Sequence, residues 1–309
     1  MNATTDLGAW TVLIAVLGGA LRVSTPYLFV SLGETLTEKS GRVNLGLEGT
    51  LIMGAMSGYA VASATGSAWL GVLGAAAAGA AFGVLHAALC SLPRVNDIAV
   101  GIGLFIFGTG LGIYLGKPLI HAVAPLLPGI PLGDWSDVPA VRAALDISPL
   151  FFAGLALAPL MDWMFRHTRW GLIVRTVGDS ADAARALGYS INGVRLAATA
   201  AGSALAGIGG AFLSLFYPGA WSEGLSSGQG LMAVTLVIFA RWNPQRCVLA
   251  ALLFGGASSL GPALQAAGVA SNYYLYGAAP YFLTLALLIR TSSTRHRLQG
   301  APGELSFNK

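Results

Sequence analysis

The residues that could do chemistry in this 309-residue chain gather in residues 41–49, which read GRVNLGLEG. This stretch holds the guanidinium of Arg42, the amide of Asn44 and the carboxylate of Glu48 among three glycines, between two apolar segments. Only 10% of the chain is charged. A charge at the centre of a membrane costs about 2.5–3.5 kcal/mol on insertion scales, so a lipid-facing helix has no use for these groups. The stretch predicts a broken membrane helix whose polar groups face a path or a partner.

The roles of the polar side chains in this stretch have two interpretations each. Asn44 offers both a donor and an acceptor, so it either bonds the backbone that the break exposes or binds a sugar hydroxyl or the edge of a base. Glu48 either fixes the break, by pairing with Arg42 or with a helix N-terminus, or serves as a pathway or gate residue. Asn96 and Asp97 precede another apolar segment and are predicted to cap its helix, with a role in the gate as the alternative.

A second group of candidates lies in the basic segment 166–195. Asp179 or Ser180 can cap a short helix, Asp182 falls in its first turn, and Gly188 is placed to end it in the left-handed conformation. A helix of about two turns does not persist alone in water. It either packs against its own bundle or acts as a coupling helix that a cytoplasmic motor moves. The candidate coupling residues are Asp179, Asp182, Ala184, Arg185, Leu187 and Gly188.

Several kinds of chemistry have no support in the sequence. The chain has no phosphate-binding P-loop, no Gly-x-Ser-x-Gly nucleophile elbow and no His-Glu-x-x-His pattern. Its four histidines form no pair at metal-binding spacing, and its two cysteines are far apart in apolar runs. We therefore expect no catalysis, no metal site and no cofactor bound by this chain. The net charge of +4 reflects clustered arginines, and we expect no nucleic-acid partner.

The elements that position these residues are predicted to be membrane helices. The chain is 55% hydrophobic, with a mean hydropathy of +0.70 and 42 glycines. A spanning helix needs about 20 apolar residues, and small residues allow such helices to pack closely. We predict an all-α polytopic membrane protein of eight to ten transmembrane helices, with at least one broken helix, as a single domain over residues 1–309. The predicted spans cover 9–20, 43–62, 69–89, 98–115, 149–165, 196–216, 228–240, 247–267 and 281–289.

The first span is ambiguous, because Arg22 and Pro26 interrupt it. It either continues to Leu32 or consists of two pieces. Orientation follows from Lys and Arg in short loops. Segment 166–195, turn 241–246 and the tail from Arg290 are basic and fall on one side, which is predicted to be cytoplasmic with the C-terminus inside. The outer loop 116–148 then faces the other way.

The polar stretch and several later motifs resemble those of ABC importer permeases for nucleosides, a branch of the group that also serves simple sugars and branched-chain amino acids. The resemblance is quite specific when the motifs are taken together, and it spans residues 25 to 260 in order. Two positions depart from the pattern: Phe105 stands where Asn is common, and Asp97 where Glu or Gln is. The similar motifs are 41–49 with 53–55, Pro26 with 31–34, 95–98 with Gly101, 174–178, 184–188, 201–211, and 228–244 with 254–255.

The resemblance implies a permease subunit without an ATPase site of its own, in a bacterial cytoplasmic (inner) membrane. The implied partners are a cytoplasmic ATP-binding subunit that uses ATP, a second permease chain that is identical or related, and an extracytoplasmic substrate-binding protein. Nucleosides are the expected substrate, with simple sugars or branched-chain amino acids as alternatives. An ion-coupled secondary carrier would need buried carboxylates within its spans and away from their ends, and the sequence offers few beyond Glu48. An intramembrane enzyme would need a nucleophile–base pair, which the sequence lacks.

Overall fold

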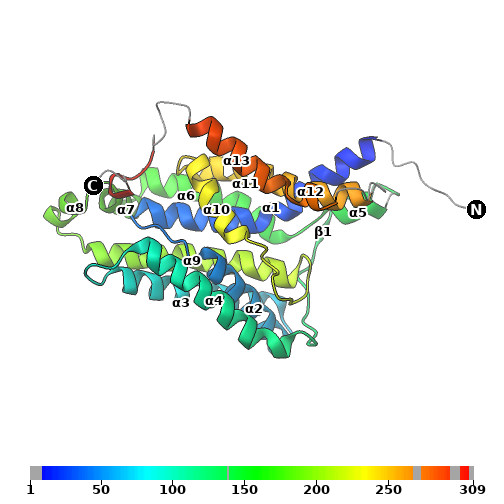
Figure 1. Ribbon diagram of the computed structural model, residues 1–309, viewed down its shortest axis with the longest axis horizontal. Helices are drawn as coiled ribbons and strands as arrows, with labels where there is room; N and C mark the ends of the chain where they lie inside the picture. The colour runs from blue at the N-terminus through cyan, green and yellow to red at the C-terminus, as the bar shows by residue number, and fades with distance from the viewer. Residues whose placement is uncertain (1–8, 138, 267–272, 293–299, 306–309) are drawn as a thin grey trace, which may run out of the picture.

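A computed structural model of the chain describes residues 9–137, 139–266, 273–292 and 300–305. Its long helices lie side by side along the long axis of the molecule (Figure 1). The helices are α1 Ala9–Lys39, α2 Leu47–Thr65, α3 Ala68–Cys90, α4 Asp97–Gly116, η1 Lys117–Leu119, α5 Pro139–Ala144, α6 Pro149–His167, α7 Arg169–Asp179, α8 Ala181–Ala186, α9 Ile191–Leu215, α10 Gln229–Phe239, α11 Pro244–Ala266, α12 Tyr273–Gly277, α13 Ala279–Ser292 and η2 Gly303–Leu305. Strands β1 Ile130–Pro131 and β2 Asp146–Ile147 pair antiparallel, with Ile130 opposite Ile147.

Four helical stretches within the described residues are long and apolar enough to cross a membrane: Ala68–Cys90, Asp97–Leu119, Ile191–Leu215 and Pro244–Gln265. They correspond to four of the predicted spans. The prediction of an all-α polytopic membrane protein is therefore confirmed. Segment 169–179, which had no predicted helix, forms α7.

The first span is one continuous helix, so the interpretation in two pieces is wrong. α1 runs for 31 residues with Pro26 inside it. A proline removes one backbone hydrogen bond, and in a membrane helix neighbouring elements can compensate for this loss. α1 packs along α9 and α11, and Arg22 lies over the ring of Tyr217, 4.0 Å from its centroid. Tertiary packing on both sides of Pro26 thus keeps α1 in one piece.

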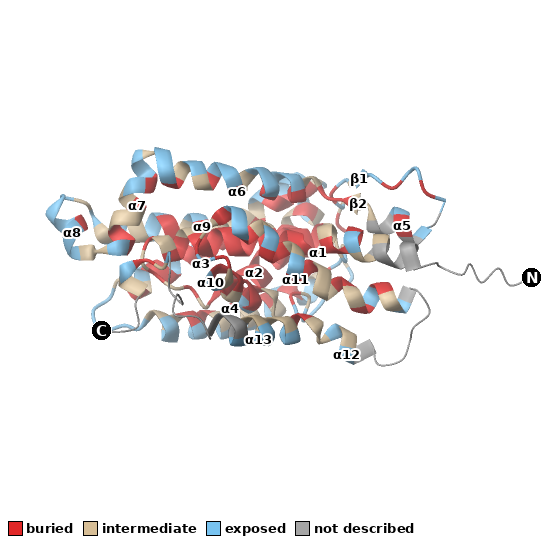
Figure 2. Cartoon of the chain, turned by 90° about the horizontal axis from the view of Figure 1, so that it is seen from above, coloured by how far each residue is buried: buried red, intermediate tan, exposed pale blue. Residues whose placement is uncertain are grey.

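The centre of the bundle is formed by α1, α2 and α9, which carry a large share of the buried residues (Figure 2). Backbones approach closely here. A Cβ added to Gly202 of α9 would lie 2.3 Å from the carbonyl oxygen of Gly33 in α1, a distance that no side chain tolerates. Small residues at helix interfaces are the usual way in which membrane helices pack. This contact fixes α1 against α9 just before the predicted break.

The two ends of the bundle differ. Helix α8 and the C-terminal segment lie at one end, here called the α8 end, whereas α5 and the two short strands lie at the other (Figure 1). Glu304 pairs with Arg195, and Gly300 lies against the carbonyl of Arg241. Segment 166–195, turn 241–246 and the described part of the tail therefore meet at the α8 end. Residues 293–299 of the predicted basic tail lie outside the described residues.

Candidate functional site

The predicted break lies between α1 and α2. α1 ends at Lys39, Gly41 adopts a positive φ of 84°, and α2 begins at Leu47. Asn44 lies inside this connection, 1% exposed. Its backbone N–H donates to Oε1 of Glu34 at 2.7 Å, and its side-chain Oδ1 accepts from the N–H of Gly46 at 2.9 Å. Asn44 thus bonds the backbone that the break exposes.

Asn44 also ties the break to α9. Its Nδ2 donates to the hydroxyl of Ser203 at 3.2 Å. Ser203 is fully buried. Both ends of the amide are therefore occupied, and a solute at this position would have to displace a hydrogen bond within the protein.

Glu48 joins the N-termini of two helices. It sits in the first turn of α2, and its Oε1 accepts from the hydroxyl of Ser226 at 2.5 Å and from the N–H of Gly228 at 2.9 Å. Its Oε2 accepts from the N–H of Gly230 at 2.6 Å. A helix N-terminus exposes unpaired N–H groups and favours a negative charge. Glu48 therefore caps α10 as well as lying in the first turn of α2, and its partner is a helix N-terminus rather than Arg42.

The backbone of α10 approaches α2 closely enough to require glycine. A Cβ at Gly230 would lie 2.6 Å from the Cα of Glu48. α10 has 11 residues, which at 1.5 Å each span about 16 Å. Trp242, three residues beyond the far end of α10, donates its indole N–H to Glu38 of α1. α10 is thus a short helix whose N-terminus lies inside the bundle, where it meets the N-terminus of α2 (Figure 1).

Arg42 pairs with a residue of α4 and not with Glu48. Its Nη1 lies 2.5 Å from Oδ1 of Asp97. Asn96 accepts hydrogen bonds from the N–H groups of Ile98 at 2.8 Å and Ala99 at 3.2 Å, so it is the N-cap of α4, as predicted. Asp97 holds the break against α4.

Two buried carboxylates were missed by the sequence reasoning. Glu34 and Glu38 of α1 are 0% and 2% exposed. Glu34 binds the backbone of Asn44, and Glu38 accepts from Trp242. Glu34 and Glu38 thus add two buried carboxylates to Glu48, and both lie in the last two turns of α1. The signal was present, because positions 34 and 38 share a face of a helix that continues through Pro26, but the expected interruption hid it.

The predicted short helix exists as α8. Ser180 is its N-cap and accepts from the N–H of Ala183 at 3.2 Å. Gly188 adopts a φ of 81° just after the helix ends, as predicted. Arg185 pairs with Asp182 at 2.8 Å on the surface, and Leu187 is 65% exposed.

Of the remaining coupling candidates, Ala184 is fully buried, and Asp179 is the last residue of α7. α8 thus packs through Ala184 and presents Arg185 and Leu187 to its surroundings.

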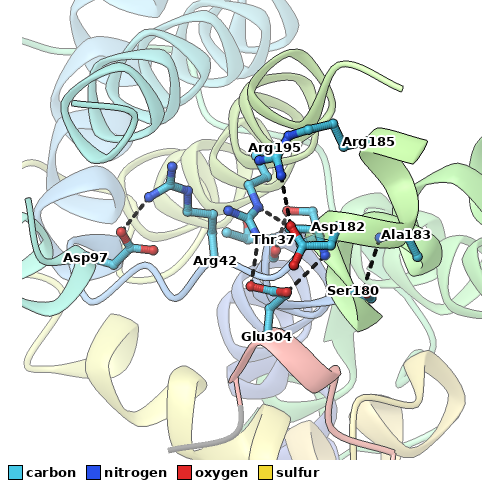
Figure 3. Close-up of polar contacts among 11 residues, drawn as sticks. Thr37, Arg42, Asp97, Ser180, Asp182, Ala183, Arg185, Arg195 and Glu304 are labelled. Atoms are coloured by element: carbon cyan, nitrogen blue, oxygen red, sulfur yellow. Dashed lines mark hydrogen bonds and ion pairs between the residues drawn. The ribbon is translucent and has the colours of Figure 1, made fainter. Parts of the chain in front are cut away.

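Arg195 of α9 connects the break to α8. Its Nε donates to the carbonyl of Ser40 at 3.1 Å, and its Nη2 lies 3.6 Å from Oε2 of Glu304. Glu304 in turn accepts from the N–H of Ala181 at the start of α8 at 2.9 Å. Figure 3 shows Arg42 with Asp97 on one side of Arg195, and Glu304 with α8 on the other.

An apolar cavity lies between the break and the C-terminal segment. Its volume is about 200 Å³. The break, α4, α10 and the C-terminal segment all contribute to its wall. Its lining residues are Glu38, Val43, Leu45, Ile98, Val234, Ile238, Trp242, Ala301 and Leu305.

A helical bundle of apolar spans with a broken helix and a buried polar junction is the architecture of a polytopic membrane permease. The chain matches, over residues 15–290, the family described as branched-chain amino acid transport system / permease component. A putative glucose ABC transporter permease, TsgC13 of Haloferax volcanii, is 32% identical over 91% of this chain and 93% of that protein.

Two further relatives have names that refer to nucleosides. The nucleoside ABC transporter permease NupC of Lactococcus lactis is 31% identical over 79% of this chain and 81% of its own length. The guanosine ABC transporter permease NupQ of Bacillus subtilis is 28% identical over 90% of this chain and 92% of its own length. The chain therefore belongs to the branched-chain amino acid transport system permease family, and it is an integral membrane permease subunit of an ABC importer.

Proposed function

We propose that this chain lines the path for nucleosides in an ABC importer and works by alternating access. The observation that carries the substrate class is the apolar cavity of about 200 Å³ beside the break. A nucleobase presents flat apolar faces that such a wall can cover. The ribose of a nucleoside would have to lie outside this wall, whereas a simple sugar carries hydroxyls all around its ring, and burying them without partners is costly. The names of NupC and NupQ support the same class.

The energy for transport comes from a cytoplasmic ATP-binding subunit that docks on α8. What supports this is the surface of α8, where Arg185 and Leu187 are exposed although the helix is anchored through the buried Ala184. The proposal places the α8 end and the C-terminus in the cytoplasm. A second permease chain, identical or related, completes the path, and an extracytoplasmic binding protein delivers the substrate at the opposite end. This chain has no ATPase site of its own, and ATP is used by its partners.

A sugar such as glucose is the second candidate, because the relative TsgC13 is a putative glucose permease. Branched-chain amino acids, which the family's description names, are a third substrate class within the same importer. The buried Glu34 and Glu38 are bonded to the backbone of Asn44 and to Trp242, so they do not favour the ion-coupled carrier over the ABC importer.

The test is uptake into proteoliposomes that contain the complete importer with its binding protein. Radiolabelled guanosine, glucose and leucine are offered separately, with ATP inside or omitted, and with or without an ion gradient. We expect ATP-dependent uptake of guanosine alone. Uptake of glucose or leucine instead would replace the substrate class, and gradient-driven uptake without ATP would overturn the ABC mechanism.

Two matched variants connect the substrate to the cavity. Ile238→Ser places a hydroxyl in the cavity wall, and we expect it to weaken guanosine uptake relative to the wild-type chain. Ile102→Ser makes the same change on the exposed face of α4, where Ile102 is 47% exposed, and it should leave guanosine uptake unchanged. Equal losses of guanosine uptake in both variants would show that the cavity is not part of the substrate path.

A further inference from the structure

We propose that residues 300–305 form a strap that transmits the movement of α8 to the break, with Glu304 as the positioning residue that makes the connection. This inference rests on the coupling role proposed for α8. The strap comprises the turn at Gly300 and the short helix η2, which lie beside α7 and α8 at the α8 end.

Glu304 bridges two elements with its two oxygens. Oε1 accepts from the backbone N–H of Ala181, the first residue of α8, at 2.9 Å. Oε2 lies 3.6 Å from Nη2 of Arg195, whose Nε donates to the carbonyl of Ser40 at the start of the break. A continuous polar connection therefore runs from α8 through Glu304 and Arg195 to the break (Figure 3).

The strap has two further attachments. The ammonium of Lys39, the last residue of α1, donates to the carbonyl of Gly300 at 3.1 Å. Gly303 lies directly on the end of α7, because a Cβ at this position would be 2.3 Å from the carbonyl oxygen of Asp179. The strap is thus held at both ends, by α1 on one side and by the junction of α7 and α8 on the other.

The other side of the strap closes the apolar cavity. Ala301 and Leu305 line the cavity together with Val43 and Leu45 of the break and Ile98 of α4. When α8 is displaced, Glu304 follows the N-terminus of α8, and the neighbouring Leu305 leaves the cavity wall. Movement at the surface of α8 therefore opens the cavity at the α8 end.

The connection through Glu304 is better shielded than the ion pair on the surface of α8. The side chains of Arg195 and Glu304 are 14% and 24% exposed, whereas those of Arg185 and Asp182 are 68% and 93% exposed. Exposed pairs contribute little because water and salt screen them. The shielded pair is the one able to carry a displacement from α8 to the break.

The test compares variants of Glu304 in the complete importer in proteoliposomes, with ATP hydrolysis and solute uptake measured on the same sample. We expect Glu304→Ala to keep ATP hydrolysis and to lower the solute taken up per ATP by about tenfold, the size expected for one charge-assisted hydrogen bond. Glu304→Asp should recover part of the ratio. Glu223→Ala, at an exposed glutamate between α9 and α10, is the control and should keep the wild-type ratio. An unchanged ratio in Glu304→Ala would overturn the proposal.

A second measurement does not depend on weakening the strap. Leu305→Cys and Ile98→Cys, both in the cavity wall, are joined by a short reducible cross-linker. Locking the strap to α4 should abolish uptake, and reduction should restore it. Uptake that continues in the cross-linked chain would show that the strap need not move.

Both measurements use whichever solute the wild-type importer takes up. If the substrate proves to be glucose, the nucleoside assignment fails and the strap is still tested. If Arg185→Glu leaves uptake normal, the coupling role of α8 is refuted. A defect confined to the Glu304 variants would then mean that the strap is needed for transport but is not controlled by α8.

Discussion

The buried junction around Glu48 and the surface helix α8 both bond the free N–H groups of a helix N-terminus, but one does so inside the bundle and the other at its surface. At the junction, Ser226, Gly228 and Gly230 are bonded to one carboxylate from a helix about 180 residues away in the chain. In α8 the adjacent Ser180 accepts from the N–H of Ala183, Glu304 of the strap accepts from the N–H of Ala181, and the pair of Arg185 with Asp182 points into solvent. Both oxygens of Glu48 are bonded within the junction, whereas α8 leaves the exposed Arg185 and Leu187 available to a second protein.

This difference indicates a division of labour. Polar groups bonded within a buried junction hold two helix ends together and are costly to disturb. Exposed groups on a short helix contribute little to the stability of their own chain, so their value lies in contacts with a partner. We therefore expect substitutions at the junction to unfold the bundle, and substitutions on α8 to spare the fold while they stop transport.

The largest effect is expected for Glu48→Ala. The change leaves the Ser226 hydroxyl and the N–H groups of Gly228 and Gly230 without partners, at about 1–3 kcal/mol for each buried donor. We expect the purified protein in detergent to lose more than about 3 kcal/mol of stability, seen as a large fall in the melting temperature or as aggregation on size exclusion.

Glu48→Gln is the matched control, because an amide keeps one acceptor oxygen and fills the same space. The stability of Glu48→Gln should lie between that of the wild type and that of Glu48→Ala. If both variants fold and transport normally, Glu48 neither holds the junction nor serves the path.

Asn44→Ala should have the next largest effect. It removes the bonds to the N–H of Gly46 and to the hydroxyl of Ser203, and both groups are then buried without these partners. We expect a loss of about 2 kcal/mol, measured by thermal unfolding in detergent. Ser203→Ala removes only the second bond, so it should cost about half as much. A larger loss in Ser203→Ala than in Asn44→Ala would contradict the role of Asn44 in holding the break.

The sequence predicts a hydrogen bond of the junction only when the two bonded residues lie close together in the chain. The break is predictable from three glycines, an amide and a carboxylate in an apolar chain, and the N-caps Ser180 and Asn96 are predictable because their partners lie two or three residues away. The partner of Glu48 is not, since Gly228 and Gly230 are brought to it by the packing of α10. The sequence places Glu48 at a helix N-terminus or beside Arg42, and only the fold selects between them.

Two other features escaped prediction for related reasons. Pro26 predicts an interruption from local rules, but packing on α9 and α11 keeps α1 continuous and so buries Glu34 and Glu38 on one face. The segment at 300–305 has only local turn signals, and its partners Ala181 and Arg195 lie more than 100 residues earlier. Local patterns thus predict where helices begin and end, whereas long-range contacts decide which polar groups are buried.

Asn96→Ala sharpens the comparison by removing an exposed cap from α4. Asn96 accepts from the N–H groups of Ile98 and Ala99, and water can replace it there. We expect a loss of about 1 kcal/mol, the usual size for an N-cap, by the same thermal assay. A loss as large as that in Asn44→Ala would mean that burial does not distinguish the two asparagines.

The smallest effect on stability is expected for Arg185→Glu, although its effect on transport should be the most complete. Arg185 is exposed and pairs with the exposed Asp182 on α8, so the melting temperature should stay near that of the wild type. Uptake by the complete importer should be lost, because the reversed charge faces the site proposed for the ATP-binding subunit. Asp182→Asn is the matched control: it breaks the same ion pair but keeps the guanidinium, and it should transport normally. If Asp182→Asn lost uptake as well, the integrity of α8, rather than its outer surface, would be what transport requires.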